Sequence, residues 1–122
     1  MKKILIVDDE ADILTSVKSF VESLGYKGKT VKSGQSALNM LSKDKYDLVL
    51  LDILMPKMSG KIVLEKIRDD PKLKNQKVAF LTVVRLNAEG RKIVKELKPV
   101  DYINKPINTT DLKKRLKKIL GE

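Results

Sequence analysis

The chain has 122 residues, of which 26 are basic and 16 acidic, so its formal net charge is +10. This length suits one domain that buries about 65% of its unfolded surface without disulfides. Cysteine and histidine are both absent. Their absence excludes thiolate zinc sites, histidine-based nucleophilic triads and histidine general acids.

No apolar run approaches the ~20 residues that a membrane helix needs. Lys2 and Lys3 are followed by only four apolar residues before Asp8. We therefore expect no secretory signal, no membrane insertion and a cytoplasmic location. The positive charge is compatible with an anionic partner, which can be a nucleic acid, an anionic surface or an acidic protein.

In the first half of the chain, short apolar runs alternate with segments of helical periodicity. Residues 4–7 predict a buried strand, and the helix that follows is closed by Gly25. Residues 29–32 predict a weaker strand, and Ser33 is the expected N-cap of a second helix. The two apolar stripes comprise Ile13, Val17, Phe20, Val21 and Leu24, and then Ala37, Leu38 and Leu41.

The second half repeats this alternation. Residues 48–51 and 78–81 predict buried strands, and residues 100–104 a weaker one. Ser59 opens a third helix, and Asp111 lies in the first turn of the last. The apolar stripes of the three helices are Val63 and Ile67, then Ile93, Val94 and Leu97, then Leu112, Leu116, Ile119 and Leu120.

Five strands alternating with five helices predict a (βα)5 fold of the α/β class with a parallel sheet. The strands at 4–7, 48–51 and 78–81 are almost wholly aliphatic, as strands buried on both faces are. The lysine-flanked strand at 29–32 suits a sheet edge. We therefore expect one flavodoxin-like, doubly wound domain over residues 1–122 with strand order 2-1-3-4-5.

In this strand order, ligands bind beyond the carboxyl ends of the strands, between the first and the third. Asp8 and Asp9 follow the first strand, Asp52 the third, Thr82 ends the fourth, and Lys105 follows the fifth. Three carboxylates this close repel one another unless a cation compensates them. Oxygen ligands at a solvent-open edge suit Mg²⁺, and a metal beside a carboxylate and a lysine suits phosphoryl transfer.

Each motif has a structural explanation when it is taken alone. An acidic pair can supply first-turn charge to a helix, threonine is a good strand former, and Lys-Pro commonly forms a surface turn. Their joint placement at one rim favours the functional interpretation.

Four segments resemble the two-component response-regulator receiver domain, as seen in single-domain chemotaxis regulators. They are ILIVDDE (4–10), LVLLDILMPKMSG (48–60), AFLTV (79–83) and DYINKP (101–106), in the order and at the spacing of that family. The resemblance covers essentially the whole chain.

The resemblance implies a role for each residue of the rim. Asp52 matches the phosphoryl acceptor, Asp9 a direct Mg²⁺ ligand, and Asp8 an acidic residue that acts largely through metal-bound water. The backbone carbonyl of Leu54 matches the third protein ligand, and Lys105 matches the lysine that pairs with the acceptor and then with the phosphoryl group.

Other matches concern switching and turns. Thr82 matches the switch hydroxyl that bonds a phosphoryl oxygen, and Tyr102 the aromatic that turns inward with it. The peptide bond before Pro106 is usually cis in this family. Gly60 and Met55-Pro56 match the turn that follows the acceptor strand.

Three features depart from the family pattern. Val83 replaces a small residue beside Thr82 and would crowd the site. Leu54 and Val84 offer no hydrogen bond to an attacking water, which predicts slow loss of an aspartyl phosphate. Lys98-Pro99-Val100 replaces a more flexible turn before the fifth strand.

The expected function is a phosphorylation-dependent switch that accepts a phosphoryl group from a sensor histidine kinase. The chain would catalyse its own phosphorylation and dephosphorylation without being a turnover enzyme. The alternative is a phosphorylation-independent binding or dimerisation module. A small-substrate phosphatase is disfavoured, because Leu54 stands where such enzymes need a second aspartate.

In receiver domains the fourth helix, fifth strand and fifth helix form the output face. This face predicts an acidic output protein, a covalently linked output domain or a homodimer as partner. Direct nucleic-acid binding is disfavoured, because aromatic residues make up only 4% of the chain. Basic residues line both helices: Arg91, Lys92, Lys95 and Lys98 in one, and Lys113, Lys114, Arg115, Lys117 and Lys118 in the other. Such charge runs are equally well explained as solvated helix faces that bind no partner.

Overall fold

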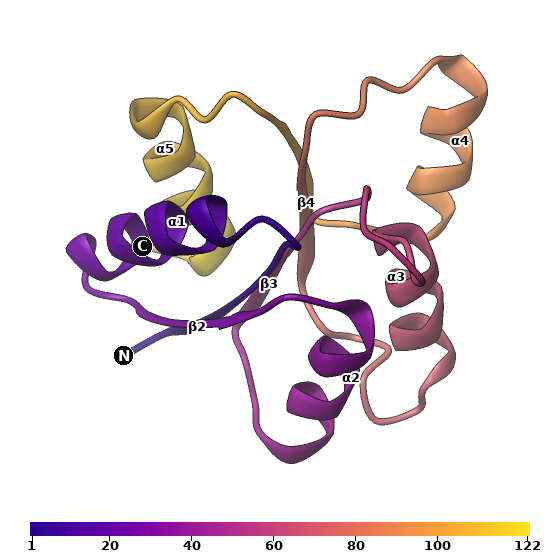
Figure 1. The fold of residues 1–122 in the computed structure, drawn as a ribbon, viewed down its shortest axis with the longest axis horizontal. Coiled ribbons are helices and arrows are strands. Elements are labelled where there is room, and N and C mark those ends of the chain that lie inside the picture. The colour runs from indigo at the N-terminus through magenta and orange to yellow at the C-terminus, as the bar shows by residue number, and fades with distance from the viewer.

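A five-stranded parallel sheet runs through the centre of the molecule, with helices on both faces (Figure 1). The computed structural model describes residues 1–122. In chain order the elements are β1 (Lys3–Val7), α1 (Ala11–Ser23), β2 (Lys27–Val31), α2 (Gly34–Lys43), β3 (Leu48–Leu51), α3 (Gly60–Asp69), β4 (Val78–Thr82), α4 (Ala88–Glu96), β5 (Asp101–Asn104) and α5 (Thr109–Leu120). The strand order β2-β1-β3-β4-β5 confirms the predicted flavodoxin-like fold.

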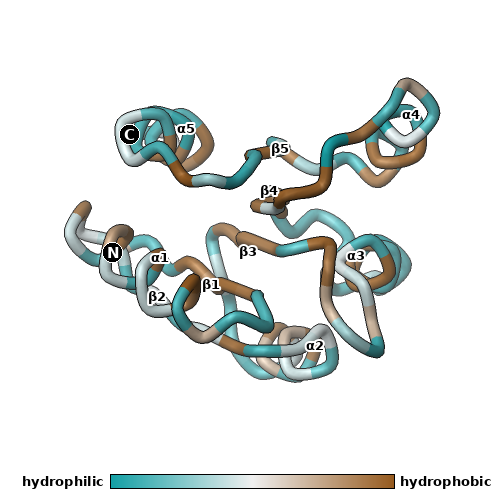
Figure 2. Tube along the Cα trace, turned by 45° about the horizontal axis from the view of Figure 1, so that its top comes forward, coloured by the Kyte–Doolittle hydropathy of each residue, from teal (hydrophilic) through white to brown (hydrophobic).

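Alternation along the strands produces two hydrophobic cores, one on each face of the sheet. Ile4 and Ile6 of β1 belong to the core under α1 and α5, whereas Leu5 and Val7 belong to the core under α2, α3 and α4. Figure 2 shows the hydrophobic colour concentrated in β1, β3 and β4, between helices that carry both colours. The three central strands are therefore buried on both faces, as their aliphatic runs predicted.

The helix ends follow the predicted capping residues. The Ser33 hydroxyl accepts from the Ser36 backbone N–H at 3.1 Å, and Ser59 caps α3 in the same way. Gly25 follows α1 with φ +92°, in the left-handed region that favours glycine. Both serines and the glycine confirm their predicted roles.

Strand β2 begins at Lys27, two residues before the predicted start. Its register pairs Lys3 with Lys27 and Ile4 with Gly28. Gly28 lies so close to α1 that an added Cβ would stand 3.1 Å from Lys18 Cγ. Because this inward position carries no side chain, the strand shows no alternating apolar pattern there.

Two helical stripes differ from the prediction. In α1, Leu14 is buried, whereas Ile13 is only partly covered. In α4, Val94 is the buried residue, and Ile93 is 49% exposed. The stripe proposed for α4 was wrong at Ile93, because this short helix makes only a narrow contact with the sheet.

Arg68 fastens the end of α3 to two other segments. Its guanidinium donates to the carbonyls of Leu97 (2.7 Å) and Lys98 (2.9 Å) after α4, and to those of Lys74 (3.0 Å) and Gln76 (2.8 Å) before β4. Burial lowers the pKa of Arg68 from its ordinary value. These four bonds fix the far end of α4 relative to the sheet.

The helices are short, and the longest, α1, has 13 residues. No helix combines the length and apolar character needed to span a membrane.

Candidate functional site

The predicted site residues gather at the carboxyl edge of the sheet. Asp8 follows β1, Asp52 follows β3, Thr82 ends β4, and Lys105 follows β5. The Asp52 backbone N–H donates to the Val7 carbonyl at 3.0 Å, and the Lys105 N–H donates to the Thr82 carbonyl at 2.9 Å. These backbone bonds continue the sheet by one residue and hold the two side chains at its rim.

Lys105 joins two carboxylates in a buried cluster. Its Nζ lies 2.6 Å from Asp8 Oδ2 and 3.5 Å from Asp52 Oδ2. The three residues are only 8%, 2% and 4% exposed, respectively. Burial works to lower the pKa of Lys105, but the hydrogen bond to Asp8 and the charges of Asp52 and Asp8 raise it overall. The lysine is therefore held as an ammonium ion.

The shorter of these two contacts differs from the expected pairing. The resemblance predicted that Lys105 pairs with Asp52, and the structure places the ammonium closer to Asp8. Asp52 is also more enclosed than a solvent-open edge would make it. Two carboxylates share one ammonium here, so this small volume retains excess negative charge.

Further carboxylates lie at the exposed mouth of this cluster. Asp8, Asp9 and Glu10 each place an oxygen within 4.8 Å of the others, and Asp9 and Glu10 are exposed. The Glu10 backbone N–H donates to Asp8 Oδ1 at 2.9 Å, and the Glu10 side chain does not cap α1. Glu10 was given no role from the sequence, although it stands in the motif with both aspartates.

The donor set fits a hard divalent cation. All the ligand atoms that these side chains offer are oxygens, one carboxylate is buried, and two face solvent. Mg²⁺ binds through one or two carboxylates and keeps several waters, which such a half-open set allows. The residues present are therefore compatible with Mg²⁺.

The loop from β3 to α3 is folded tightly against Asp52. The Leu54 backbone N–H donates to Asp52 Oδ1 at 3.3 Å, and the Gly60 N–H donates to the Ile53 carbonyl at 2.9 Å. A Cβ on Gly60 would stand 2.1 Å from the Asp52 carbonyl oxygen. Gly60 is thus the residue that lets α3 begin directly beneath the Asp52 backbone. That the Leu54 carbonyl is a metal ligand stays a prediction.

Thr82 and Tyr102 lie at the same rim but are linked through Val84. The buried Thr82 Oγ1 accepts from the Val84 N–H at 3.3 Å, and the Val84 carbonyl accepts from the Tyr102 hydroxyl at 2.8 Å. Asn104 Nδ2 donates to the same carbonyl at 3.0 Å.

Among the predicted site residues, the structure brings Asp8, Asp52 and Lys105 into direct contact. It holds Thr82 and Tyr102 in a second, adjoining network.

This second network contains the predicted Tyr102, which is half-buried, and the amide of Asn104, which sequence reasoning missed. The Tyr102 ring lies 5.7 Å from that of Phe80, centroid to centroid. Burial raises the pKa of the Tyr102 hydroxyl, and the charge of Asp52 adds to this effect. Asn104 was not singled out, although its place directly before Lys105 at a strand end was a usable signal.

Apolar side chains stand exposed around the rim. Leu54 is 56% exposed and Val83 is 55% exposed. More than half of the Val83 surface is therefore accessible to solvent. The expectation that Val83 crowds the site itself stays a prediction.

The comparison with known families agrees with this geometry. Residues 4–117 match the response regulator receiver domain family. The chain belongs to this family. Receiver domains of two-component systems are phosphorylation-dependent signalling switches, and membership of the family supports this general function for the chain.

Individual relatives support the same assignment. The receiver domain is 40% identical over 113 residues to a probable cyclic di-GMP phosphodiesterase of Vibrio cholerae, covering 93% of this chain and 25% of that protein. The chain spans between a quarter and about half the length of the first curated relatives that it matches.

Two solved structures are similar over nearly their whole length. The chemotaxis protein CheY4 of Vibrio cholerae has a TM-score of 0.90 at 28% identity, covering 98% of this chain and 99% of that chain. The response regulator TrrA of Thermotoga maritima, crystallised in complex with Mg(2+)-BeF, has a TM-score of 0.85 at 37% identity, covering 98% of this chain and 100% of that chain.

Proposed function

We propose that Asp52 accepts a phosphoryl group from the phosphohistidine of a sensor histidine kinase. The observation that carries this proposal is the convergence of Asp8 and Asp52 on the buried Lys105 ammonium at the carboxyl edge of the sheet. An Asp52 oxygen attacks phosphorus, the phosphorus–nitrogen bond breaks, and the imidazole of the kinase leaves. Phosphorylation by a sensor kinase implies a cytoplasmic location.

Asp8, Asp9, Asp52 and the Leu54 carbonyl would hold Mg²⁺ at this site. When bound, Mg²⁺ neutralises charge on the phosphoryl oxygens. The chain's own residues do the rest. Lys105 presents a second positive charge to the same oxygens, and the Leu54 N–H orients the Asp52 carboxylate at 3.3 Å.

Switching would follow from the second network. A phosphoryl oxygen on Asp52 would accept a hydrogen bond from the Thr82 hydroxyl and draw it toward the site, and the Thr82 Oγ1 at present accepts from the Val84 N–H. Movement of Thr82 would disturb Val84, whose carbonyl holds the Tyr102 hydroxyl. The state of Asp52 is in this way read at β5, on the face formed by α4, β5 and α5.

That face is where we expect the partner to bind. The candidates are an acidic output protein, a covalently linked output domain or a second copy of the chain. Its basic residues favour an acidic surface, and Arg115 is already committed to Asp101 (2.7 Å) and Asp111 (2.8 Å) within the chain. The remaining cations of α4 and α5 form no ion pair within the chain, and of them Arg91 donates to the Leu86 carbonyl at 3.1 Å.

Intact-mass measurement tests the proposal. With Mg²⁺ and a small-molecule phosphodonor, the wild-type chain should gain the mass of one phosphoryl group, and Asp52→Asn should not. Asp69→Asn is the matched control, because Asp69 is exposed at the end of α3. It should be phosphorylated like wild type, and a chelator should abolish the gain in both.

A wild-type chain that gains no mass, or gains it equally in Asp52→Asn, would contradict the proposal. Either result would favour the alternative, a phosphorylation-independent binding or dimerisation module.

A further inference from the structure

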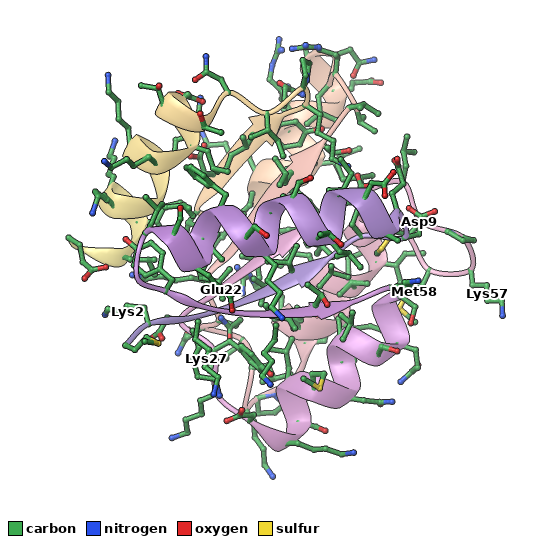
Figure 3. The ribbon with its side chains drawn as sticks, turned by 60° about the vertical axis from the view of Figure 1, so that its left-hand side comes forward. Lys2, Asp9, Glu22, Lys27, Lys57 and Met58 are labelled. Carbon is green, nitrogen blue, oxygen red and sulfur yellow. The ribbon has the colours of Figure 1, made fainter.

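A second concave surface lies at the opposite end of the sheet, where the strands begin. It is a hollow of about 570 Å³ between the α2–β3 and α3–β4 connections. Figure 3 shows Lys2 and Lys27 at one end of the molecule and Asp9 at the other. A five-residue strand such as β1 separates the ends by about 16 Å, or about two Debye lengths at physiological salt. The acidic site therefore does not neutralise this surface.

The hollow carries unpaired positive charge. Its walls contain two carboxylates, and Lys3 already engages both: Asp44 pairs with the Lys3 ammonium, and Asp47 accepts the Lys3 backbone N–H at 2.7 Å. Five other lysines line it, and none forms an ion pair: Lys2, Lys43, Lys45, Lys72 and Lys77. Of these five, only Lys77 donates to a protein acceptor through its ammonium group, which lies 3.0 Å from the Ile119 carbonyl oxygen.

The residues that line the hollow offer little aromatic or apolar surface, so a ligand that binds by stacking or by burying an apolar group is disfavoured. Tyr46 is the aromatic residue of the lining, and it is buried with the Lys3 ammonium 4.8 Å from its ring centroid. No exposed ring is thus available for a nucleic-acid base. Of the three leucines in the lining, Leu41 and Leu120 are buried and only Leu73 is partly exposed, which leaves little for a peptide side chain to bury against.

Clustered lysines are compatible with phosphate groups. Lysine is a common phosphate ligand that acts as a point charge, so several ammonium groups can each meet an oxygen of one multiply charged anion. The α3–β4 connection is anchored as well, because Arg68 donates to the Lys74 and Gln76 carbonyls. The backbone that carries Lys72 and Lys77 is in this way held in place before any ligand arrives.

We propose that this hollow binds an oligophosphate chain, either free or carried by a nucleotide. A compact anion with several charges neutralises neighbouring lysines at a lower entropic cost than several separate carboxylates. The site is separate from Asp52, and the proposal does not depend on the phosphorylation of Asp52.

Titration of the full chain with tripolyphosphate tests the proposal, with a chelator present so that no metal draws phosphate to Asp52. Amide chemical shifts should change saturably at residues 41–47 and 72–77. The triple variant Lys43→Gln, Lys45→Gln, Lys72→Gln should weaken binding about tenfold or more. Because all three side chains are exposed, the fold should be retained, and the urea midpoint checks this.

The matched control removes the same charge from α4 and α5, through Lys92→Gln, Lys113→Gln and Lys114→Gln, which are also exposed and do not line the hollow. It should weaken binding less than about twofold. Equal weakening in the two variants, shifts that do not saturate, or shifts confined to α5 would overturn the proposal.

A parallel titration with ATP distinguishes the sources of the phosphate chain. Affinity equal to that of tripolyphosphate would admit nucleotides, and much weaker affinity would restrict the ligand to free oligophosphate.

Discussion

Replacing Gly60 by alanine tests whether the site depends on the close approach of α3 to the Asp52 backbone. Gly60 is the first residue of α3, and an added Cβ would stand 2.1 Å from the Asp52 carbonyl oxygen and 2.9 Å from Ile53 Cα. Non-bonded carbon atoms normally lie about 3.5–4.0 Å apart. The helix or the loop must therefore move by about 1 Å.

Two opposing effects decide the sign of the change in stability. Alanine in place of glycine favours a helix interior by up to about 1 kcal/mol. Overpacking costs about 1–3 kcal/mol, and here the obstructing atoms are backbone, which no side-chain rotation can clear. We expect Gly60→Ala to lose about 2 kcal/mol, which lowers the urea midpoint by about 1 M.

The same displacement should slow phosphorylation, because it shifts the Asp52 backbone. A misplacement of about 1 Å at a reacting group can cost about a hundredfold in rate. The assay combines urea unfolding followed by circular dichroism with a time course of intact mass in Mg²⁺ and phosphodonor.

Gly90→Ala in α4 is the matched control. A Cβ there would meet only side-chain atoms, Asn87 Oδ1 at 3.2 Å and Leu86 Cδ2 at 3.3 Å, which can yield. We expect this variant to be neutral or to gain about 0.5 kcal/mol from helix propensity. If Gly60→Ala proves as stable as Gly90→Ala and is phosphorylated at the wild-type rate, the reasoning from close approach is wrong.

Two further predictions concern the end of α4 and the apolar rim. Arg68→Met should lose about 2–4 kcal/mol in urea unfolding, since it removes four bonds to carbonyls. Arg91→Met removes one exposed bond and should lose about 1 kcal/mol or less, so equal losses would count against the role of Arg68. Polar residues at Leu54 and Val84 should speed phosphoryl loss about two- to tenfold, as one added hydrogen bond allows. If the phosphoryl group of the wild type is short-lived and its lifetime is the same in both variants, the prediction is wrong.

Local patterns in the sequence were enough to predict the fold. The aliphatic runs at 4–7, 48–51 and 78–81 became the three central strands, and the lysine-flanked segment became an edge. Because parallel strands end at one edge, the residues after each run could be placed together from the sequence alone. Asp8, Asp52 and Lys105 meet there as predicted.

The predictions were wrong or incomplete where burial, strand length or hydrogen-bond partners depend on contacts between helices and strands. Ile93 has helical spacing but remains 49% exposed, because burial depends on how far α4 packs onto the sheet. Strand β2 extends through Gly28, whose missing side chain removes the pattern that would reveal it. Arg68 resembles any surface arginine in sequence, and its four carbonyl partners come from segments up to 30 residues away.

The sequence by itself determined which residues are apolar on each face and which polar residue stands at each strand end, because both follow from periods of two or 3.6 residues. Tertiary structure alone decided which partner each charge takes. Lys105 lies closer to Asp8, 97 positions away, than to Asp52. At the far end of the sheet, five lysines that form no ion pair line one hollow. Both arrangements depend on distances between segments that are far apart in the sequence, which local patterns do not specify.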